Sequence, residues 1–370
     1  MAVTRATHEL LEKALARIDL SWDDARHLLA LDVNSDDAYA LLAAANRYTR
    51  QQSGGRGTVY SQVGLNVWPC PENCDFCYLA TKHGIVKELH ELTPDAVVAR
   101  ARTFEAAGAD EVYLMTTANY PLTRFLEIGQ EVRRALDPRT VLVANIGDFG
   151  RADAYRLRDT GFAGVYHVYR FGEGVVTEIE PARRRATFAA ISEVGLDLRY
   201  CVEPLGPEHT PDEIVAQMFL AREFGATIAA VMRRIPVPGT PFEHAGLLTE
   251  TEVAKIVAVV RLVLGERLRE MGVHEPSLLA LRAGAHRICA EVGMNPRDLA
   301  VDTATGRGRS VADCEAMLWE AGFVHERKRG GVSNGIVPER RENKRETCVA
   351  TTSGRAAGGE HESMKKWGRC

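Results

Sequence analysis

The central part of the chain alternates two patterns of apolar and polar residues. Short runs rich in β-branched side chains predict buried strands, and longer runs in which apolar residues recur every three or four positions predict amphipathic helices. The strand-like runs begin near residues 59, 111, 140, 164, 197 and 227, with a further candidate at 287. The helical runs between them cover 93–108, 121–136, 151–161, 181–195, 210–225 and 249–265.

The ends of the helical runs carry capping residues. Thr210-Pro-Asp-Glu213 and Thr249-Glu-Thr-Glu252 have the capping-box pattern, and Thr93-Pro-Asp95 starts its helix in a similar way. A glycine follows the last periodic residue of most runs, which is typical of a left-handed C-cap. These glycines are Gly108, Gly161, Gly195, Gly225 and Gly265.

The spacing of the strands predicts the fold class. From residue 111 onward the strand starts lie 29, 24, 33 and 30 residues apart, the length of one βα unit. Six or more consecutive units favour an α/β fold of the (β/α) barrel type, full or partial, over a doubly wound sheet. No GxGxxG follows a strand, which disfavours a dinucleotide-binding domain. In a barrel of this kind the chemistry lies at the C-terminal ends of the strands.

Appendages flank the predicted barrel. We expect an N-terminal helical extension over residues 1–55, the barrel over 56–300, a C-terminal helical extension over 301–323 and a tail over 324–370. Two or three helices fit residues 9–18, 22–31 and 36–50, with apolar faces that include Leu11, Leu15 and Ile18. We expect them to pack on the base or flank of the barrel.

Charge separates the tail from the rest. The 370 residues carry a formal charge of −4. Residues 324–370 hold eleven Lys and Arg against six Asp and Glu, so the tail is at +5 and the remaining residues are at −9. An acidic body is not a nucleic-acid footprint, so we expect no nucleic-acid partner. The glycine-rich tail lacks apolar periodicity and is predicted to be disordered, with folding over the active site or binding a partner as the alternative.

The chain is predicted to be cytoplasmic. Its most apolar stretch, residues 256–264, is interrupted by Arg261 and falls far short of the roughly 20 residues of a membrane span. The first 32 residues lack the apolar core of a signal peptide. A reducing compartment makes ligands, nucleophiles or core residues better interpretations of the eight cysteines than disulfides.

Three of these cysteines lie within eight residues, as Cys70, Cys74 and Cys77 in a C-x3-C-x2-C arrangement after the first predicted strand. Three thiolates on one loop can hold three irons of a cubane iron–sulfur cluster and leave the fourth iron open to a small molecule. Structural zinc needs four ligands, and the nearby candidate for a fourth is His83. Zinc and three unrelated core cysteines are the alternatives.

This motif, with Phe76 before the third cysteine, resembles the radical S-adenosylmethionine (AdoMet) superfamily. The likeness extends over about residues 45–323. It is strongest to the branch that contains biotin synthase, the hydrogenase-maturation radical enzyme and methylornithine synthase. Further matching stretches are CPENCDFCY from Cys70, PVPGTPF at 236–242, AGAH at 283–286 and a late helix that ends in EAGF at 320–323.

The resemblance implies cofactors and a reaction class. Cys70, Cys74 and Cys77 would be both the metal ligands and the catalytic centre, holding a [4Fe-4S] cluster whose open iron binds AdoMet. One electron from a reductase such as flavodoxin or ferredoxin would cleave AdoMet, and the 5′-deoxyadenosyl radical would abstract hydrogen from a small metabolite. No membrane partner is expected, and a homodimer is left open.

The resemblance also assigns residues to AdoMet. Phe76 would pack on the adenine, and Thr116 and Thr117 stand where many relatives carry the Gly-Gly-Glu that meets the AdoMet ammonium. Arg170 resembles the arginine of the branch's R-x-E-T segment, and Arg184 aligns with an arginine that salt-bridges the AdoMet carboxylate. Surface ion pairs are the alternative for both. Glu208 matches the last position of a ribose-contacting motif. The full set is Phe76, Thr116, Thr117, Arg170, Arg184 and Glu208.

One departure separates the chain from biotin synthase. That enzyme holds a second, sulfur-donating cluster on three barrel cysteines, and Tyr113, Val143 and Arg199 occupy the corresponding positions. We therefore expect rearrangement or fragmentation of a small, amino-acid-like substrate. The alternatives are sulfur insertion through an atypical auxiliary iron–sulfur cluster, to which Cys201 and Cys289 could contribute, and a non-catalytic metal-binding protein.

Overall fold

The computed structural model describes residues 2–291 and 309–326. The tail that the sequence predicts to be disordered lies outside the described residues from position 327 onward. The first part of the predicted C-terminal extension, residues 301–308, also lies outside them.

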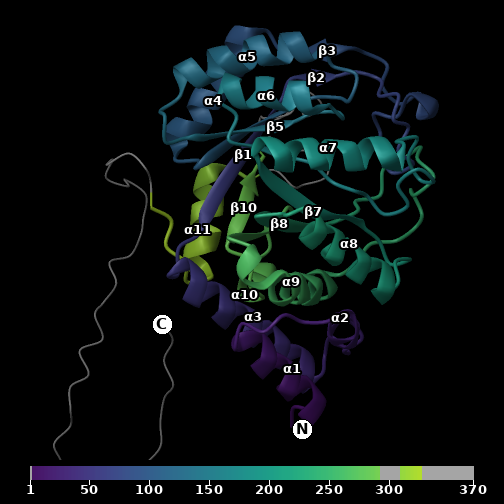
Figure 1. Ribbon diagram of the computed structural model, residues 1–370, viewed down its shortest axis with the longest axis vertical. Helices are drawn as coiled ribbons and strands as arrows, with labels where there is room; N and C mark the ends of the chain where they lie inside the picture. Colours follow the sequence, from purple (N-terminus) through teal and green to yellow (C-terminus); the bar gives the residue numbers. More distant parts are fainter. Residues whose placement is uncertain (1, 292–308, 327–370) are drawn as a thin grey trace, which may run out of the picture. The chain divides into compact units, whose positions relative to one another are not determined.

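Eight parallel strands close into a barrel in the order β1-β10-β9-β8-β7-β6-β5-β4 (Figure 1). The barrel closes where β1 pairs with β4, from Tyr60 beside Glu111 to Gly64 beside Met115. The predicted (β/α) barrel is thus confirmed, and it is complete. Its strands are β1 Thr58–Gly64, β4 Glu111–Met115, β5 Val141–Asn145, β6 Gly164–Tyr166, β7 Asp197–Leu205, β8 Ile228–Arg233, β9 Glu270–Val273 and β10 Arg287–Ala290.

Helices surround the barrel, and several begin and end at the predicted caps. Thr210 and Thr249 form complete capping boxes, and Gly108 and Gly161 are left-handed C-caps. Gly265 differs in its backbone (φ 55°, ψ −136°), because a 3-10 turn, η2 Gly265–Arg267, follows at once. The helices are α4 Pro94–Ala107, α5 Leu122–Ala135, α6 Arg151–Thr160, α7 Pro181–Val194, α8 Pro211–Glu223, α9 Glu250–Leu264, α10 Leu278–Arg282 and α11 Val311–Glu320.

The N-terminal helices pack on the flank of the barrel. They are α1 Arg5–Leu15, α2 Trp22–Leu29 and α3 Asp36–Ser53. Helix α3 lies along α9 and α10 (Figure 1), where Thr49 Oγ1 donates to the Gly284 carbonyl at 2.6 Å. The predicted apolar face was wrong at Ile18, which follows the end of α1 and is 56% exposed. Two cavities of about 470 and 670 Å³ open near these helices, away from the cysteine loop.

The strand pattern divides the side chains between two environments. Outward residues such as Val112 and Leu142 pack under the helices, whereas Tyr60, Tyr113, Val143 and Cys289 form a separate inward cluster. Alternation along each strand makes this division, because successive side chains point to opposite faces. The barrel interior is therefore lined by aromatic and polar groups.

The sequence pattern did not reveal several short elements. Strand β9 has four residues, and helix α10 has five. The antiparallel pair β2 Asn66–Val67 and β3 His90–Glu91 flanks the cysteine loop in the sequence. No helix within the described residues is both long and apolar enough to cross a membrane.

Candidate active site

The predicted site residues lie at or beyond the C-terminal ends of the strands. The cysteines follow β1 and β2, Thr116 and Thr117 follow β4, Arg170 follows β6, and Glu208 follows β7. Parallel strands bring these ends to one rim of the barrel, which is where barrel enzymes place their chemistry. Arg184 reaches the same rim from the first turn of α7.

The cysteine loop is held by its own backbone. The Cys70 amide donates to the Leu79 carbonyl at 2.7 Å, and the Thr81 amide donates to the Cys70 carbonyl at 3.1 Å. Inside this closure the Cys77 amide donates to the Cys74 carbonyl at 3.0 Å. None of the three forms a disulfide within the described residues, and all three are partly buried. The loop thus presents three cysteines on a backbone that is already folded.

A second segment, residues 172–178 after β6, fixes the loop from outside. The Asp75 amide donates to the Val176 carbonyl at 2.9 Å, and the Glu178 amide donates to the Glu72 carbonyl at 2.8 Å. Asn73 adds a side-chain hydrogen bond to the Glu178 carboxylate at 2.9 Å. These bonds cross from the first to the fourth barrel unit, so the loop has a fixed position over the rim.

Asp148, an aspartate with a buried side chain, follows β5 and contacts His167 and Arg184. Its Oδ1 lies 3.0 Å from His167 Nε2 and 3.1 Å from Arg184 Nη1. Burial alone would raise the pKa of Asp148, but the His167 hydrogen bond and the Arg184 charge outweigh it and hold the pKa below its usual range. Burial, reinforced by Arg184, lowers the pKa of His167 to about 4, so the imidazole is neutral near pH 7.

Arg184 is therefore not a surface residue. It is 5% exposed, and its Nε also lies 3.7 Å from the Glu173 carboxylate. Burial lowers its pKa from the usual arginine value, and the neighbouring Arg170 acts in the same direction. The surface ion pair considered from the sequence is wrong for this residue, because Asp148 and Glu173 hold its guanidinium inside the rim.

Arg170 lies between the loop and the barrel interior. Its Nη2 is 3.6 Å from Glu203 Oε1, and its backbone amide donates to Glu173 at 2.8 Å. Burial opposes the charged guanidinium, but Glu203 and the other acidic groups around it together outweigh burial and raise the Arg170 pKa. Tyr166 donates to the other Glu203 oxygen at 2.6 Å. This group joins β6 and β7 above the inward aromatic cluster.

Of the remaining predicted residues, Thr117 and Glu208 have partners within the chain. The Thr117 amide donates to Asn66 Oδ1 at 3.0 Å, and Asn66 Nδ2 donates to Thr117 Oγ1 at 2.7 Å, so this residue supports the β2 segment. Glu208 pairs with Arg234, and although its partial burial opposes the charge, that hydrogen bond lowers its pKa. Phe76 is partly buried on the cysteine loop.

Comparison with known proteins gives one consistent class. No protein-family model matches the chain. The biotin synthase of Heliobacterium modesticaldum is 29% identical over 304 residues, which are 79% of this chain and 90% of that protein. The biotin synthase of Saccharopolyspora erythraea is 28% identical over 328 residues, 86% of this chain and 89% of its own.

The chain is a radical AdoMet enzyme. Solved structures agree with its fold. The methylornithine synthase structure superposes with a TM-score of 0.73 at 19% identity, covering 86% of this chain and 97% of that one. The [FeFe]-hydrogenase maturase HydG gives 0.74 at 17% identity, covering 88% and 77%. Membership of this class implies a [4Fe-4S] cluster, AdoMet, a small-molecule substrate and an electron donor.

The residues of the radical AdoMet enzyme fit these cofactors. Within the described residues, the three loop thiols do not gather closely enough for one metal ion to bind all of them. This disfavours a single zinc ion held by the three thiols, whereas in a cubane each thiolate binds a different iron. His83 Nε2 contacts the Cys74 carbonyl at 3.3 Å. Burial raises the Cys74 pKa to about 12 without iron, although Arg170 opposes the shift.

A further polar group at the rim is the hydroxyl of Thr116. Thr116 Oγ1 is buried and makes no hydrogen bond within the described part of the chain. Unsatisfied buried hydroxyls are uncommon in folded proteins, so such a group indicates a ligand or ordered water. It lies directly after β4, at the position that the family resemblance assigns to the AdoMet ammonium.

Sequence reasoning missed three groups of the radical AdoMet enzyme. Asp148 and Glu203 hold the two predicted arginines, and Glu72 pairs with Arg183 beside the loop. Asp148 could have been found, because it follows β5 directly and strand ends are where barrel chemistry lies. Glu203 and Glu72 had no such signal, since their partners lie far along the chain.

Proposed function

We propose that this enzyme abstracts hydrogen from a small, amino-acid-like metabolite and directs its rearrangement or fragmentation, with Cys70, Cys74 and Cys77 holding the [4Fe-4S] cluster. The observation that supports this most directly is that side chains fill the barrel interior near the N-terminal ends of the strands. The positions corresponding to the sulfur-donating cluster of biotin synthase hold side chains that are already engaged with one another.

Those side chains form a network near the N-terminal ends of the strands, which we call the floor of the barrel. Arg199 Nη2 lies 3.3 Å from Glu111 Oε1, and Arg287 Nη2 donates to Glu111 Oε2 at 2.6 Å. Arg287 also donates to the Tyr113 hydroxyl at 2.9 Å, and Val143 packs beside that ring. A second cluster at this level would have to displace a buried ion network. The arrangement therefore favours chemistry with the AdoMet cluster alone.

When bound, the reduced cluster and AdoMet supply a 5′-deoxyadenosyl radical. Arg184 is oriented by Asp148 for the AdoMet carboxylate, to which a guanidinium fork is geometrically suited. Thr116 offers a hydroxyl and Phe76 an aromatic face to the remainder of the cofactor. The loop anchors at Val176 and Glu178 keep the cysteines over the rim, and the inward aromatic residues keep water out.

The interior above the floor suits a zwitterionic substrate. Glu203 presents a carboxylate for an ammonium group, and Arg170 presents a guanidinium for a carboxylate. Burial raises the pKa of Tyr166 well above its ordinary value, so its hydroxyl stays protonated and keeps donating to Glu203. The Glu203 carboxylate and the Arg170 guanidinium would bind the ammonium and carboxylate groups of an amino acid, beside the Tyr166 hydroxyl.

Two measurements test the proposal. Anaerobically purified and reconstituted enzyme should contain about four irons per chain, as one cubane requires. Six to eight irons would instead favour sulfur insertion through an auxiliary cluster, the second candidate, in which the inward-facing Cys201 and Cys289 would take part. Deuterated candidate amino acids should transfer label into 5′-deoxyadenosine. Label transfer from none of them, alongside transfer from a substrate of another chemical class, would overturn the substrate proposal.

The partners of the reaction follow from the same proposal. The electron is supplied by a reductase of the flavodoxin or ferredoxin type, which would dock near the cysteine loop. A cytoplasmic location keeps the thiols reduced for cluster assembly. A homodimer is compatible with the proposal but is not required by any residue of the rim.

A further inference from the structure

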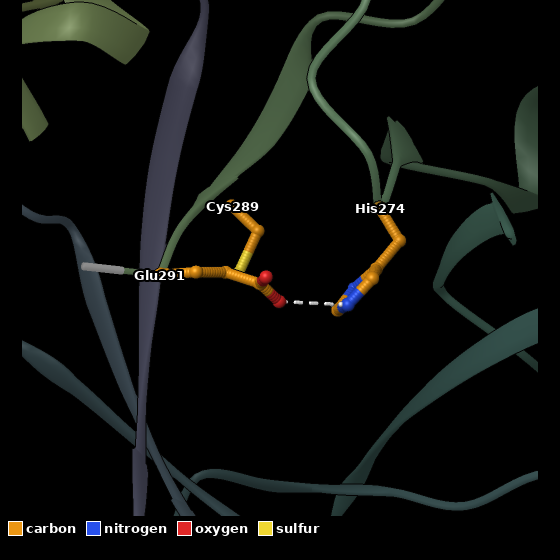
Figure 2. Close-up of side chains that lie close together, drawn as sticks. All are labelled: His274, Cys289 and Glu291. Carbon is orange, nitrogen blue, oxygen red and sulfur yellow. Dashed lines mark hydrogen bonds and ion pairs between the residues drawn. The ribbon is translucent and has the colours of Figure 1, made fainter. Parts of the chain in front are cut away.

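A second group of potential metal ligands lies on β9 and β10, the two strands that follow β1 in the order of the barrel. His274 follows β9, Cys289 lies in β10, and Glu291 follows β10. One ligand atom from each lies within 4.8 Å of the others, and Figure 2 shows the three side chains pointing toward one another. This group does not include any residue of the cysteine loop.

The geometry of the three donors is close to that of a metal site. His274 Nε2 and Glu291 Oε1 are 2.9 Å apart, and Cys289 Sγ is 4.0 Å from the same oxygen. Tetrahedral zinc, with bonds of about 2.0 Å to nitrogen or oxygen and 2.3 Å to sulfur, separates its ligand atoms by roughly 3.3–3.8 Å. Side-chain shifts of about 1 Å would therefore close the present arrangement around one ion.

Neighbouring side chains support each ligand. The Tyr60 hydroxyl lies 3.3 Å from His274 Nδ1, which leaves Nε2 directed at Glu291. Gln62 Nε2 lies 3.5 Å from Cys289 Sγ and can donate to a thiolate. Metal-binding histidines usually hydrogen-bond through the other ring nitrogen, and such partners orient the ligands. Both supporting residues come from β1, the strand next to β10.

We propose that His274, Cys289 and Glu291 bind a single divalent transition-metal ion of the zinc type. Within the described residues no fourth His, Cys, Asp or Glu joins the group. Catalytic zinc sites have three protein ligands and an open position. Water, or an oxygen or nitrogen of the substrate, would take it. A bound ion would then orient the substrate within the barrel.

Burial argues for a cation among these donors. Cys289 is fully buried, the Glu291 side chain is 3% exposed, and the His274 side chain is 14% exposed. A carboxylate and a thiolate in one buried site need a positive charge to offset their loss of hydration. The imidazole alone would be a weaker partner than a divalent ion. A His274–Glu291 ion pair without metal is the competing outcome.

Zinc binding to the intact enzyme tests the inference. Full-length protein with its reconstituted [4Fe-4S] cluster is equilibrated anaerobically with Zn²⁺ and desalted, and its zinc is counted by mass spectrometry. We expect one zinc per chain, with an X-ray absorption spectrum of one sulfur near about 2.3 Å and nitrogen or oxygen ligands near about 2.0 Å. Three sulfurs would place the zinc on the cysteine loop and overturn the proposal.

Variants locate the ion. Cys289→Ala, His274→Gln and Glu291→Gln should each lower zinc affinity at least about tenfold. Cys201→Ala removes another buried cysteine of the barrel and should leave zinc affinity unchanged. His274→Gln changes a rim residue, so it remains informative if Cys289→Ala fails to fold. Wild-type affinity in His274→Gln and Glu291→Gln, or no zinc in the wild type, would refute the site. None of these readouts requires turnover.

Discussion

Single charged residues at the rim are held in one protonation state by their neighbours. Asp148 stays ionised and His167 stays neutral because both share one buried contact with Arg184. The contact with Glu203 likewise keeps Arg170 charged. Each arginine is therefore already oriented and charged. Such pre-organisation removes the need to arrange side chains when an anionic ligand binds.

The cysteine loop makes a direct prediction for one residue. Cys74→Ala should lower the iron content from about four to below about one per chain, because two thiolates hold a cubane poorly. Reductive cleavage of AdoMet to 5′-deoxyadenosine should be lost with the iron. Cys314→Ala, which changes a buried cysteine in α11, is the control and should retain both. Full iron content in Cys74→Ala would contradict the ligand assignment.

A buried histidine outside the rim predicts a pH effect on stability. His286 is 3% exposed, and its pKa is lowered to about 3 by burial and by the charges of Arg261 and Arg287. Only the unfolded chain takes up this proton between pH 6.5 and 5, so stability is present above pH 6.5 and is lost as the pH falls. The loss over that interval is about 2 kcal/mol.

The contribution of His286 can be isolated by comparing pH profiles. Urea unfolding of His286→Gln should show a decline in stability about 2 kcal/mol smaller than that of the wild type between pH 6.5 and 5. His8→Gln changes an exposed histidine on α1 and should leave the wild-type profile intact. An identical decline in His286→Gln would mean that other groups cause the acid sensitivity.

At the scale of elements, strand β6 shows how a small residue makes room for an ion network. An added Cβ at Gly164 would collide with the Arg199 guanidinium and the Asp197 carbonyl oxygen. The glycine thus lets Arg199 of β7 lie flat across the neighbouring strand toward Glu111. The register of β6 against β7, which pairs Gly164 with Asp197, puts the glycine there.

Gly164→Ala should therefore destabilise the protein by about 2–3 kcal/mol, in the range for overpacking a filled interior. Urea unfolding measures the loss. Gly150→Ala, at the start of α6, has no atom within 4 Å of the added Cβ and should cost less than about 1 kcal/mol. Equal stability of the two variants would show that Arg199 can move aside without penalty.

At the scale of the whole molecule, Glu111 joins distant parts of the barrel. It pairs with Arg199 from β7 and with Arg287 from β10, and these charges lower its pKa to about 2 despite its burial. Arg287 also contacts Glu270 of β9 at 2.7 Å. One carboxylate thus connects strands that lie on different sides of the closed sheet.

Glu111→Gln should cost about 3–5 kcal/mol, because it leaves two buried guanidinium groups without their shared charge partner. The measurement is urea unfolding of the full chain at neutral pH. Glu127→Gln, on the exposed face of α5, should change stability by less than about 0.5 kcal/mol. A loss below about 1 kcal/mol in Glu111→Gln would show that the floor relaxes around the missing charge.

The amino-acid sequence by itself determined the repeating βα units, most helix ends and the cysteine loop. Each of these is encoded within a short window: a period of two or 3.6, a capping residue such as Thr210, or the spacing of Cys70, Cys74 and Cys77. The inward or outward direction of Cys201 also followed from alternation along one strand. These features depend on neighbours in the chain, so they can be derived before any tertiary contact is known.

Only the tertiary structure decided which side chains meet across the barrel. Glu111 and Arg287 are 176 residues apart in the chain, and Glu203 of β7 contacts Arg170, which follows the neighbouring strand β6. The His274–Cys289–Glu291 group depends on β9, which the sequence pattern did not reveal. Closure of the sheet and the register between its strands create these contacts, and neither property is contained in a local window of sequence.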